Sequence, residues 1–157
     1  GIVGRGVLID IPAYRKAKMK LGELIMPEEL DKILKDQKIE LRPGDIVFIR
    51  TGLGIENSRE KRTGLHPKCL QWVANNKIAL LGYDGDSDSS TKVLDRYDSP
   101  FHTVAIPYLG LPLIDNAELD ALSKMCLIEK RYDFFISIAP WKLEGTTSSP
   151  INPIAIF

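Results

Sequence analysis

The side chains that could do chemistry gather in the second half of the sequence, around His102 and Asp115. His102 ends the motif Ser-Pro-Phe-His at the exit of a long polar segment, and Asp115 follows 13 positions later, after the apolar run Leu-Pro-Leu-Ile. An imidazole with its ordinary pKa of about 6.5 can serve as a general base, a general acid or a metal ligand. We therefore weigh a catalytic or metal-binding pair against a structural histidine and an aspartate that caps the following helix.

A metal-dependent site needs more ligands than this pair supplies. A hydrolytic metal ion takes about three or four protein ligands, mostly histidine and carboxylate. The sequence holds two histidines in all, and His66, directly before Pro67, has the position of a helix cap or an exposed side chain. Asp84, Asp86 and Asp88 alternate as in a calcium loop, but the glycine and the distal glutamate of such a loop do not follow in register. The sequence therefore resembles part of a metal-hydrolase pocket without its main ligand cluster.

A loop of small and hydroxyl-bearing residues, Gly145 to Pro153, is the second candidate site. Its sequence, Gly-Thr-Thr-Ser-Ser-Pro-Ile-Asn-Pro, combines backbone donors with two prolines that restrict the chain. Such a loop either brings N–H groups to a substrate carboxylate or oxyanion or is a tight connection without a ligand. The sequence contains no complete dinucleotide fingerprint, no phosphate loop and no Gly-x-Ser-x-Gly elbow, which argues against an ordinary serine hydrolase.

Apolar runs and helical periodicities alternate along the chain and must position these residues. The expected strands cover 6–11, 46–49, 77–82, 111–114, 133–139 and 154–157, and the expected helices begin at Pro27, Pro67 and Glu118. This alternation predicts a mixed α/β sheet in a single domain, 1–157. The segments 15–20 and 52–64 are expected to be solvated loops, and 83–100 a longer loop without packing. We expect a rigid strand to hold His102.

The composition sets the class of protein. With 157 residues, of which 44% are hydrophobic, the chain can bury a core, and 21 basic residues balance 21 acidic ones, so we expect no nucleic-acid partner. No apolar run approaches the roughly 20 residues of a membrane helix, so we expect no membrane partner. Cys69 and Cys126 lie far apart in helical patterns and are predicted to be buried, reduced thiols. We expect a cytoplasmic protein.

Six segments, in their order and spacing, resemble the family named Putative cyclase, a group of metal-dependent hydrolases that includes bacterial kynurenine formamidase and isatin hydrolase. The resemblance runs essentially from end to end of the chain. It implies a swivelling β/β/α domain with a mixed sheet, here as the C-terminal part of a longer family member. The segments are Arg5–Asp10, Leu41–Asp45, Arg50–Gly52, Pro100–His102, Gly110–Asn116 and Gly145–Pro153.

The resemblance also implies roles for single residues. The family's signature His-x-Gly-Thr-His-x-Asp-x-Pro-x-His supplies most ligands for zinc or manganese, and it does not occur in this sequence. The family's later pocket histidine corresponds to His102, and its carboxylate near a second metal, commonly glutamate, to the shorter Asp115. Thr147, Ser149 and Asn152 match the loop on the substrate side. Ser148 replaces a glycine there, which would strain the loop if positive φ were required.

The implied reaction is the opening of a small amide or lactam by a metal-activated water, with histidines moving protons. Because the main metal motif is absent, we expect this chain alone to bind metal poorly and to be inactive. The alternative is a non-catalytic binding or oligomerisation module on the same fold. Under either hypothesis the family implies a homo-oligomer, a dimer or larger.

Overall fold

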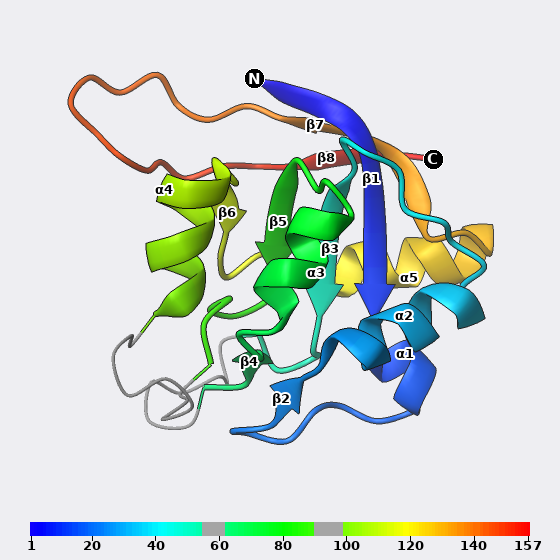
Figure 1. Cartoon of the computed structure of the whole chain (residues 1–157). Helices are drawn as coiled ribbons and strands as arrows, with labels where there is room; N and C mark the ends of the chain where they lie inside the picture. The colour runs from blue at the N-terminus through cyan, green and yellow to red at the C-terminus, as the bar shows by residue number, and fades with distance from the viewer. Residues whose placement is uncertain (55–61, 90–98) are drawn as a thin grey trace.

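A six-stranded mixed sheet lies at the centre of the computed structural model, which describes residues 1–54, 62–89 and 99–157 (Figure 1). The strands lie in the order β6-β5-β3-β1-β7-β8. Their bounds are Ile2–Asp10 for β1, Ile46–Arg50 for β3, Leu80–Tyr83 for β5, Leu113–Ile114 for β6, Asp133–Ile138 for β7 and Ile154–Ile156 for β8. The short strands β2 (Leu24–Ile25) and β4 (Gly64–Leu65) form a separate parallel pair.

The directions of the strands place four strand ends at one edge of the sheet. β1, β3, β5 and β6 pair in parallel, whereas β7 is antiparallel to both β1 and β8. Since parallel strands run the same way, their carboxyl ends meet at a common edge, where open α/β sheets usually bind ligands. The mixed α/β class predicted from the sequence is confirmed.

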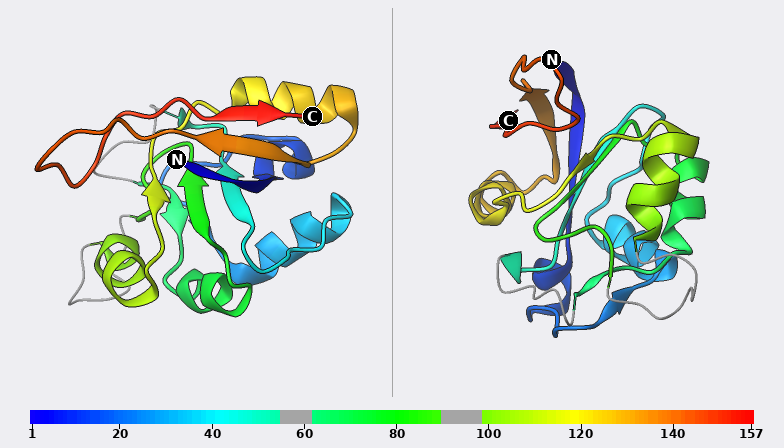
Figure 2. Two further views of the ribbon diagram at one scale, coloured as in Figure 1. Left: turned by 90° about the horizontal axis from the view of Figure 1, so that it is seen from above. Right: turned by 90° about the vertical axis from the view of Figure 1, so that its left-hand side faces the viewer.

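Helices cover both faces of the sheet, and side chains alternate along β1 to meet them. Val7 and Ile9 belong to one buried cluster, with residues of α2 and α3, whereas Leu8 belongs to the other, with residues of α5. Figure 2 shows α5 on one side of the sheet and α2, α3 and α4 on the other. The helices are α1 (Ile11–Arg15), α2 (Pro27–Asp36), α3 (Cys69–Asn75), a π-helix (Phe101–Ala105), α4 (Ile106–Leu109) and α5 (Asp120–Glu129).

The start of the chain differs from the sequence prediction. β1 begins at Ile2 and ends at Asp10, so Ile11 starts a helix and does not finish a strand. Pro12 lies in the first turn of this helix, which suits its fixed φ, and Asp10 caps the helix by accepting a hydrogen bond from the Ala13 N–H (3.1 Å). Arg15 is not merely solvated, since its guanidinium pairs with Glu29 at 2.6 Å.

Two further predictions are wrong: that the segment 83–100 does not pack, and that a strand holds His102. Residues 84–89 pack closely, with Asp84, Ser87 and Asp88 buried, although 90–98 lie outside the described residues. His102 stands on the π-helix Phe101–Ala105 and not above a strand. The carboxylate of Asp88 accepts hydrogen bonds from the first backbone N–H groups of this helix, which explains why the apolar run turns into a helix here.

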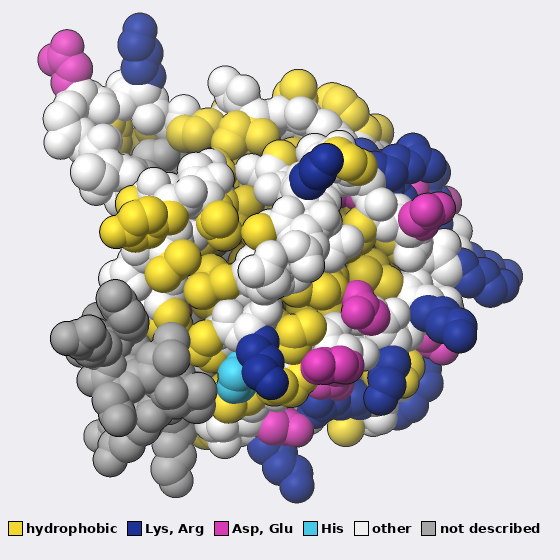
Figure 3. All heavy atoms as spheres, viewed as in Figure 1, with side chains coloured by type: hydrophobic (Ala, Val, Ile, Leu, Met, Phe, Trp, Pro, Cys, Tyr) yellow, Lys and Arg dark blue, Asp and Glu magenta, His cyan; other side chains and the backbone are white. Residues whose placement is uncertain are grey.

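The distribution of charged side chains on the surface agrees with the balanced numbers of basic and acidic residues. On the face seen in Figure 3, basic and acidic side chains are interspersed and not segregated by sign. Within residues 1–54, 62–89 and 99–157, no helix combines the length and the apolar character that crossing a membrane requires.

Both cysteines are free and buried, as predicted. Burial raises the pKa of the Cys69 and Cys126 thiols to about 12. A thiolate is the reactive form of cysteine, so we expect a disulfide reagent at pH 8 to modify the folded chain at least about 100-fold more slowly than the urea-unfolded chain. Absorbance of the released chromophore measures both rates, and equal rates would contradict the burial of these thiols.

Candidate functional site

The parallel strands deliver polar side chains to the shared edge of the sheet. Asp10 ends β1, Arg50 ends β3, Asp84 follows β5 and Asp115 follows β6. Arg50 and Asp10 pair with each other at 2.9 Å. Asp84 accepts hydrogen bonds from the Thr51 and Gly52 N–H groups and holds the β3 exit against the β5 exit. Of these residues, Asp115 alone faces His102.

His102 and Asp115, paired by the sequence analysis, lie in contact. The ring of His102 sits between two carboxylates: Nδ1 is 2.7 Å from Asp88 Oδ2, and Nε2 is 3.0 Å from Asp115 Oδ2. Asp88 is fully buried, whereas the side chain of His102 is 40% exposed. The ring therefore has a fully buried partner at Nδ1 and a partly exposed partner at Nε2.

Backbone groups fix the two carboxylates. Asp88 accepts from the N–H of Phe101 through Oδ1 (2.6 Å) and from the N–H of His102 through Oδ2 (3.2 Å). Asp115 accepts from the N–H of Ser87 (2.9 Å). The helix cap considered for Asp115 is not observed, because Leu119 occupies the N-cap position of α5. Asp115 instead ties β6 to the segment after β5.

The pKa values of the pair follow from these surroundings. Partial burial alone would lower the pKa of His102, but the hydrogen bond to Asp88 and the charges of Asp115, Asp88 and Asp86 outweigh it and raise the pKa. Burial raises the pKa of Asp115, although the Ser87 N–H and the His102 charge oppose it. Both groups therefore hold a proton more readily than in water, which suits acid–base chemistry near neutral pH.

The donor atoms of the cluster fit part of a divalent-metal site. Among the described residues, Asp86, Asp88 and His102 place possible ligand atoms within 4.8 Å of one another. Asp88, however, already accepts three hydrogen bonds, and Asp86 accepts from Arg62 and from the Asp88 N–H. His102 Nε2 and Asp115 Oδ2 are the better pair of ligands, because a metal-binding histidine commonly has its other nitrogen held by a carboxylate. Two ligands fall short of the three or four that such a metal takes.

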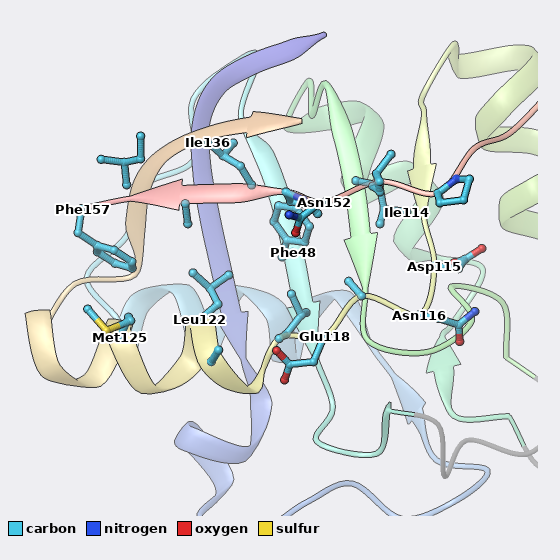
Figure 4. A pocket seen from close by; sticks show the side chains of 18 of the residues that line it. Phe48, Ile114, Asp115, Asn116, Glu118, Leu122, Met125, Ile136, Asn152 and Phe157 are labelled. Carbon is cyan, nitrogen blue, oxygen red and sulfur yellow. The ribbon is translucent and has the colours of Figure 1, made fainter. Parts of the chain in front are cut away.

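A groove of about 980 Å³ extends from Asp115 along the face of the sheet beneath α5, and His102 is not among the residues that line it (Figure 4). Asp115 lies at one end of the groove, and Met125 and Phe157 lie at the other. Its walls are largely apolar, with Phe48 and Ile136 on the sheet. Such a surface accommodates an apolar ligand with a few polar groups near one end.

The loop 145–153 reaches the groove only through its second half. Ser149 and Asn152 line the groove, whereas Thr147 is exposed and does not line it. Ser149 Oγ accepts from the Trp141 N–H (3.2 Å), which ties the two arms of the loop together. Ser148 does not have positive φ, so no glycine is required at that position.

Sequence reasoning missed the roles of Asp88 and Ser87. Asp88 was considered only as part of a calcium loop, although its spacing after β5 puts it at the sheet edge beside His102. His66 Nδ1 accepts a hydrogen bond from the Lys68 N–H (3.1 Å) in the turn before α3, but it does not cap the helix, because Lys68 occupies the N-cap position. The signal that could have revealed Asp88 is a carboxylate at the exit of a buried strand, the same signal that marked Asp115.

Comparisons with known proteins give one matching family model and several similar solved structures. The family model described as Putative cyclase matches residues 1–87, which is more than half of the chain. The chain is similar to a solved structure described as a novel cyclase, with 29% identity and a TM-score of 0.86 over 99% of this chain and 54% of that chain. No curated protein matches the chain.

Two more solved structures share the fold at lower identity. One is isatin hydrolase A from Ralstonia solanacearum, with a TM-score of 0.72 and 18% identity over 98% of this chain and 59% of that chain. The other is a predicted metal-dependent hydrolase from Bacillus stearothermophilus, with a TM-score of 0.69 and 17% identity over 98% of this chain and 63% of that chain. The chain thus spans between about half and two thirds of the length of these three structures.

Proposed function

The chain belongs to the Putative cyclase family, and on that premise we propose that it serves a metal-dependent hydrolase that opens a small amide or lactam. The observation that carries the proposal is the geometry of His102. Its Nδ1 is anchored on the buried Asp88, and its Nε2 lies beside Asp115 at the carboxyl edge of the sheet. Nitrogen and carboxylate ligands of this kind suit zinc or manganese.

His102 and Asp115 are proposed as the residues of this chain that contribute to the metal site, with His102 Nε2 acting either as a ligand or as a proton shuttle. A bound divalent ion would polarise the carbonyl and lower the pKa of water at the site. In the shuttle role, His102, whose pKa is raised by Asp88 and its acidic neighbours against the effect of burial, can accept a proton at Nε2 and return it to the leaving nitrogen. Asp115 keeps the ring oriented while this happens. The ligands that complete the site are those of the family signature, which this sequence does not contain.

The groove is proposed to receive the apolar body of the substrate. Phe48, Leu122 and Ile136 provide apolar walls, and Asn152 and Ser149 provide polar groups. One solved relative is an isatin hydrolase bound to the product analogue thioisatinate, which fits a flat lactam as the type of ligand. Thr147, which the family resemblance also suggests, would need to move to reach the groove.

The remaining expectations stay proposals. We propose that residues 1–157 act as one cyclase-like domain and that the protein associates as a homo-oligomer. Exposed apolar side chains on β7 and β8, such as Phe135 (49% exposed) and Ile154 (56% exposed), favour association. The same surface also suits the alternative, a non-catalytic binding or oligomerisation module.

Metal binding by the purified chain tests the proposal. With only two ligands from the described residues, we expect calorimetry with zinc or manganese to give a Kd weaker than about 1 μM, and His102→Ala to abolish the remaining binding. His66→Ala is the matched control and should leave binding unchanged. Isatin and an N-formyl aromatic amine serve as substrates, and we expect no turnover by the chain alone.

The outcomes distinguish the metal-dependent hydrolase from the non-catalytic module. Tight stoichiometric metal or measurable turnover would overturn the expected inactivity of the isolated chain. Metal binding that is indifferent to His102→Ala would overturn the site itself. The intact mass and metal content of the natively expressed protein add a second discriminator, since a mass well above 17.6 kDa with about one metal per subunit favours the hydrolase. A mass equal to that of the chain, without metal, favours the module.

A further inference from the structure

The two histidines of this chain have opposite partners at Nδ1. In His102, Nδ1 faces a carboxylate oxygen of Asp88 at 2.7 Å, and a carboxylate can only accept. In His66, Nδ1 lies 3.1 Å from the backbone nitrogen of Lys68, which can only donate. A neutral imidazole carries one proton, so the His66 ring carries it on Nε2, whereas in His102 the carboxylates at Nδ1 and at Nε2 (Asp115 Oδ2, 3.0 Å) compete for it.

We propose that Asp88 is a positioning residue that holds the neutral ring of His102 in the Nδ1–H tautomer, in competition with Asp115, whose Oδ2 lies 3.0 Å from Nε2. The inference rests on the proposed function only for the use made of Nε2 as a ligand or proton acceptor. The neutral tautomer that prevails for histidine in water carries its proton on Nε2, and Asp115 favours the same tautomer. The side chain of Asp115 is 23% exposed, so water can solvate it when Nε2 carries no proton, whereas the side chain of Asp88 is fully buried and has no such replacement for the ring N–H. The partner that reverses the preference must therefore be the buried one. Asp88 is that partner.

Burial makes Asp88 suitable for this role. It is fully buried and accepts from the N–H of Phe101, the N–H of His102 and the His102 ring, so its two oxygens are fixed on three donors. The same two backbone bonds start the helix that carries the ring. Asp88 therefore sets the position of the His102 backbone and the orientation of its side chain together.

The backbone on the other side of Asp88 is equally confined. Asp88 forms a parallel bridge with Leu65, directly after Gly64. A Cβ on Gly64 would lie 2.7 Å from the Ser89 backbone nitrogen and 2.9 Å from the Asp88 carbonyl carbon, so strand β4 and this segment touch through their main chains. A carboxylate on a backbone fixed in this way cannot move to accommodate the other tautomer of His102.

Nitrogen-15 spectra of the histidine-labelled full chain test the proposal. Long-range proton–nitrogen correlations at alkaline pH, where the rings are neutral, show which nitrogen bears the proton, and His66→Gln assigns the two ring systems. We expect Nδ1–H with a bare Nε2 for His102, and the reverse for His66 within the same spectrum. Any state of the wild-type His102 ring other than a bare Nε2 overturns the proposal.

Matched variants separate positioning from mere folding. In Asp88→Asn we expect the Nδ1–H form of His102 to fall from the dominant to the minor tautomer, whereas Asp86→Asn, the same change two residues away, leaves it dominant. Retention of the Nδ1–H form in a folded Asp88→Asn chain overturns the proposal. If that variant does not fold, the wild-type spectrum alone decides whether the tautomer proposal holds. Added zinc shifts the bare Nε2 if the proposed function holds, so a failure of metal binding is distinguished from a failure of the tautomer assignment.

Discussion

Arg50→Met is expected to lower the free energy of unfolding by about 3 to 5 kcal/mol. The guanidinium of Arg50 pairs at 2.9 Å with Asp10, whose side chain is fully buried. Asp10 also accepts from the Ala13 N–H and from the Ser123 hydroxyl, which joins β1, α1 and α5. Removal of the arginine leaves a negative charge inside the protein that, among residues 1–54, 62–89 and 99–157, has only these neutral donors, and an unpaired buried charge is costly.

The same arginine provides its own control. Arg50 also contacts Asp120 at 2.8 Å, but the side chain of Asp120 is 65% exposed. Because water screens an exposed pair, Asp120→Asn should cost at most about 1 kcal/mol. Urea unfolding followed by circular dichroism measures both variants. Equal losses for Arg50→Met and Asp120→Asn would show that the burial of Asp10 does not decide the energy.

Apolar patterning predicted the framework of the fold well, because the sheet is buried on both faces. Residues 46–49 are entirely apolar, and the corresponding strand β3 is buried from Ile46 to Ile49. Strand ends were harder to place, since they depend on polar partners that lie far away in the sequence. β1 ends at Asp10 because the carboxylate of Asp10 caps the helix that begins at Ile11, and an apolar run gives no sign of this.

The site was predictable only in part for a related reason. Asp115 could be recognised as a carboxylate after a strand, and its contact with His102 follows from the position of β6 beside β5. Asp88 is a fully buried acid, which composition alone argues against. Its burial is possible because three N–H groups meet it, and two of them belong to a helix that the apolar pattern did not predict.

The loop 145–153 shows the limit of motif matching. The motif treats Thr147, Ser149 and Asn152 as equivalent members of one substrate loop. In three dimensions the residues after the loop's midpoint follow the sheet into β8, so Ser149 and Asn152 line the groove while Thr147 faces solvent. Proximity to a strand, not membership of the motif, decides which of these residues borders the cavity.

Asp84→Ala is the second substitution with a large expected effect, a loss of about 3 to 5 kcal/mol in the free energy of unfolding. The carboxylate of Asp84 accepts from the Thr51 N–H (2.9 Å), the Thr51 hydroxyl (2.8 Å) and the Gly52 N–H (2.8 Å). Burial raises the pKa of this carboxyl, and the hydrogen bonds and the charge of Arg50 oppose the rise. The alanine variant leaves three donors in a buried place without their acceptor.

Thr51→Val separates the side-chain bond from the backbone bonds. Valine keeps the shape of Thr51 but removes the donor to Asp84 and the acceptor of the Leu53 N–H (3.2 Å), so we expect a loss of about 1 to 2 kcal/mol. The difference between the two variants then measures how strongly Asp84 holds the backbone after β3 to the end of β5. Denaturant midpoints give both values, provided the slopes agree. Should Asp84→Ala cost no more than Thr51→Val, the backbone bonds contribute little, and the exits of β3 and β5 are held by packing alone.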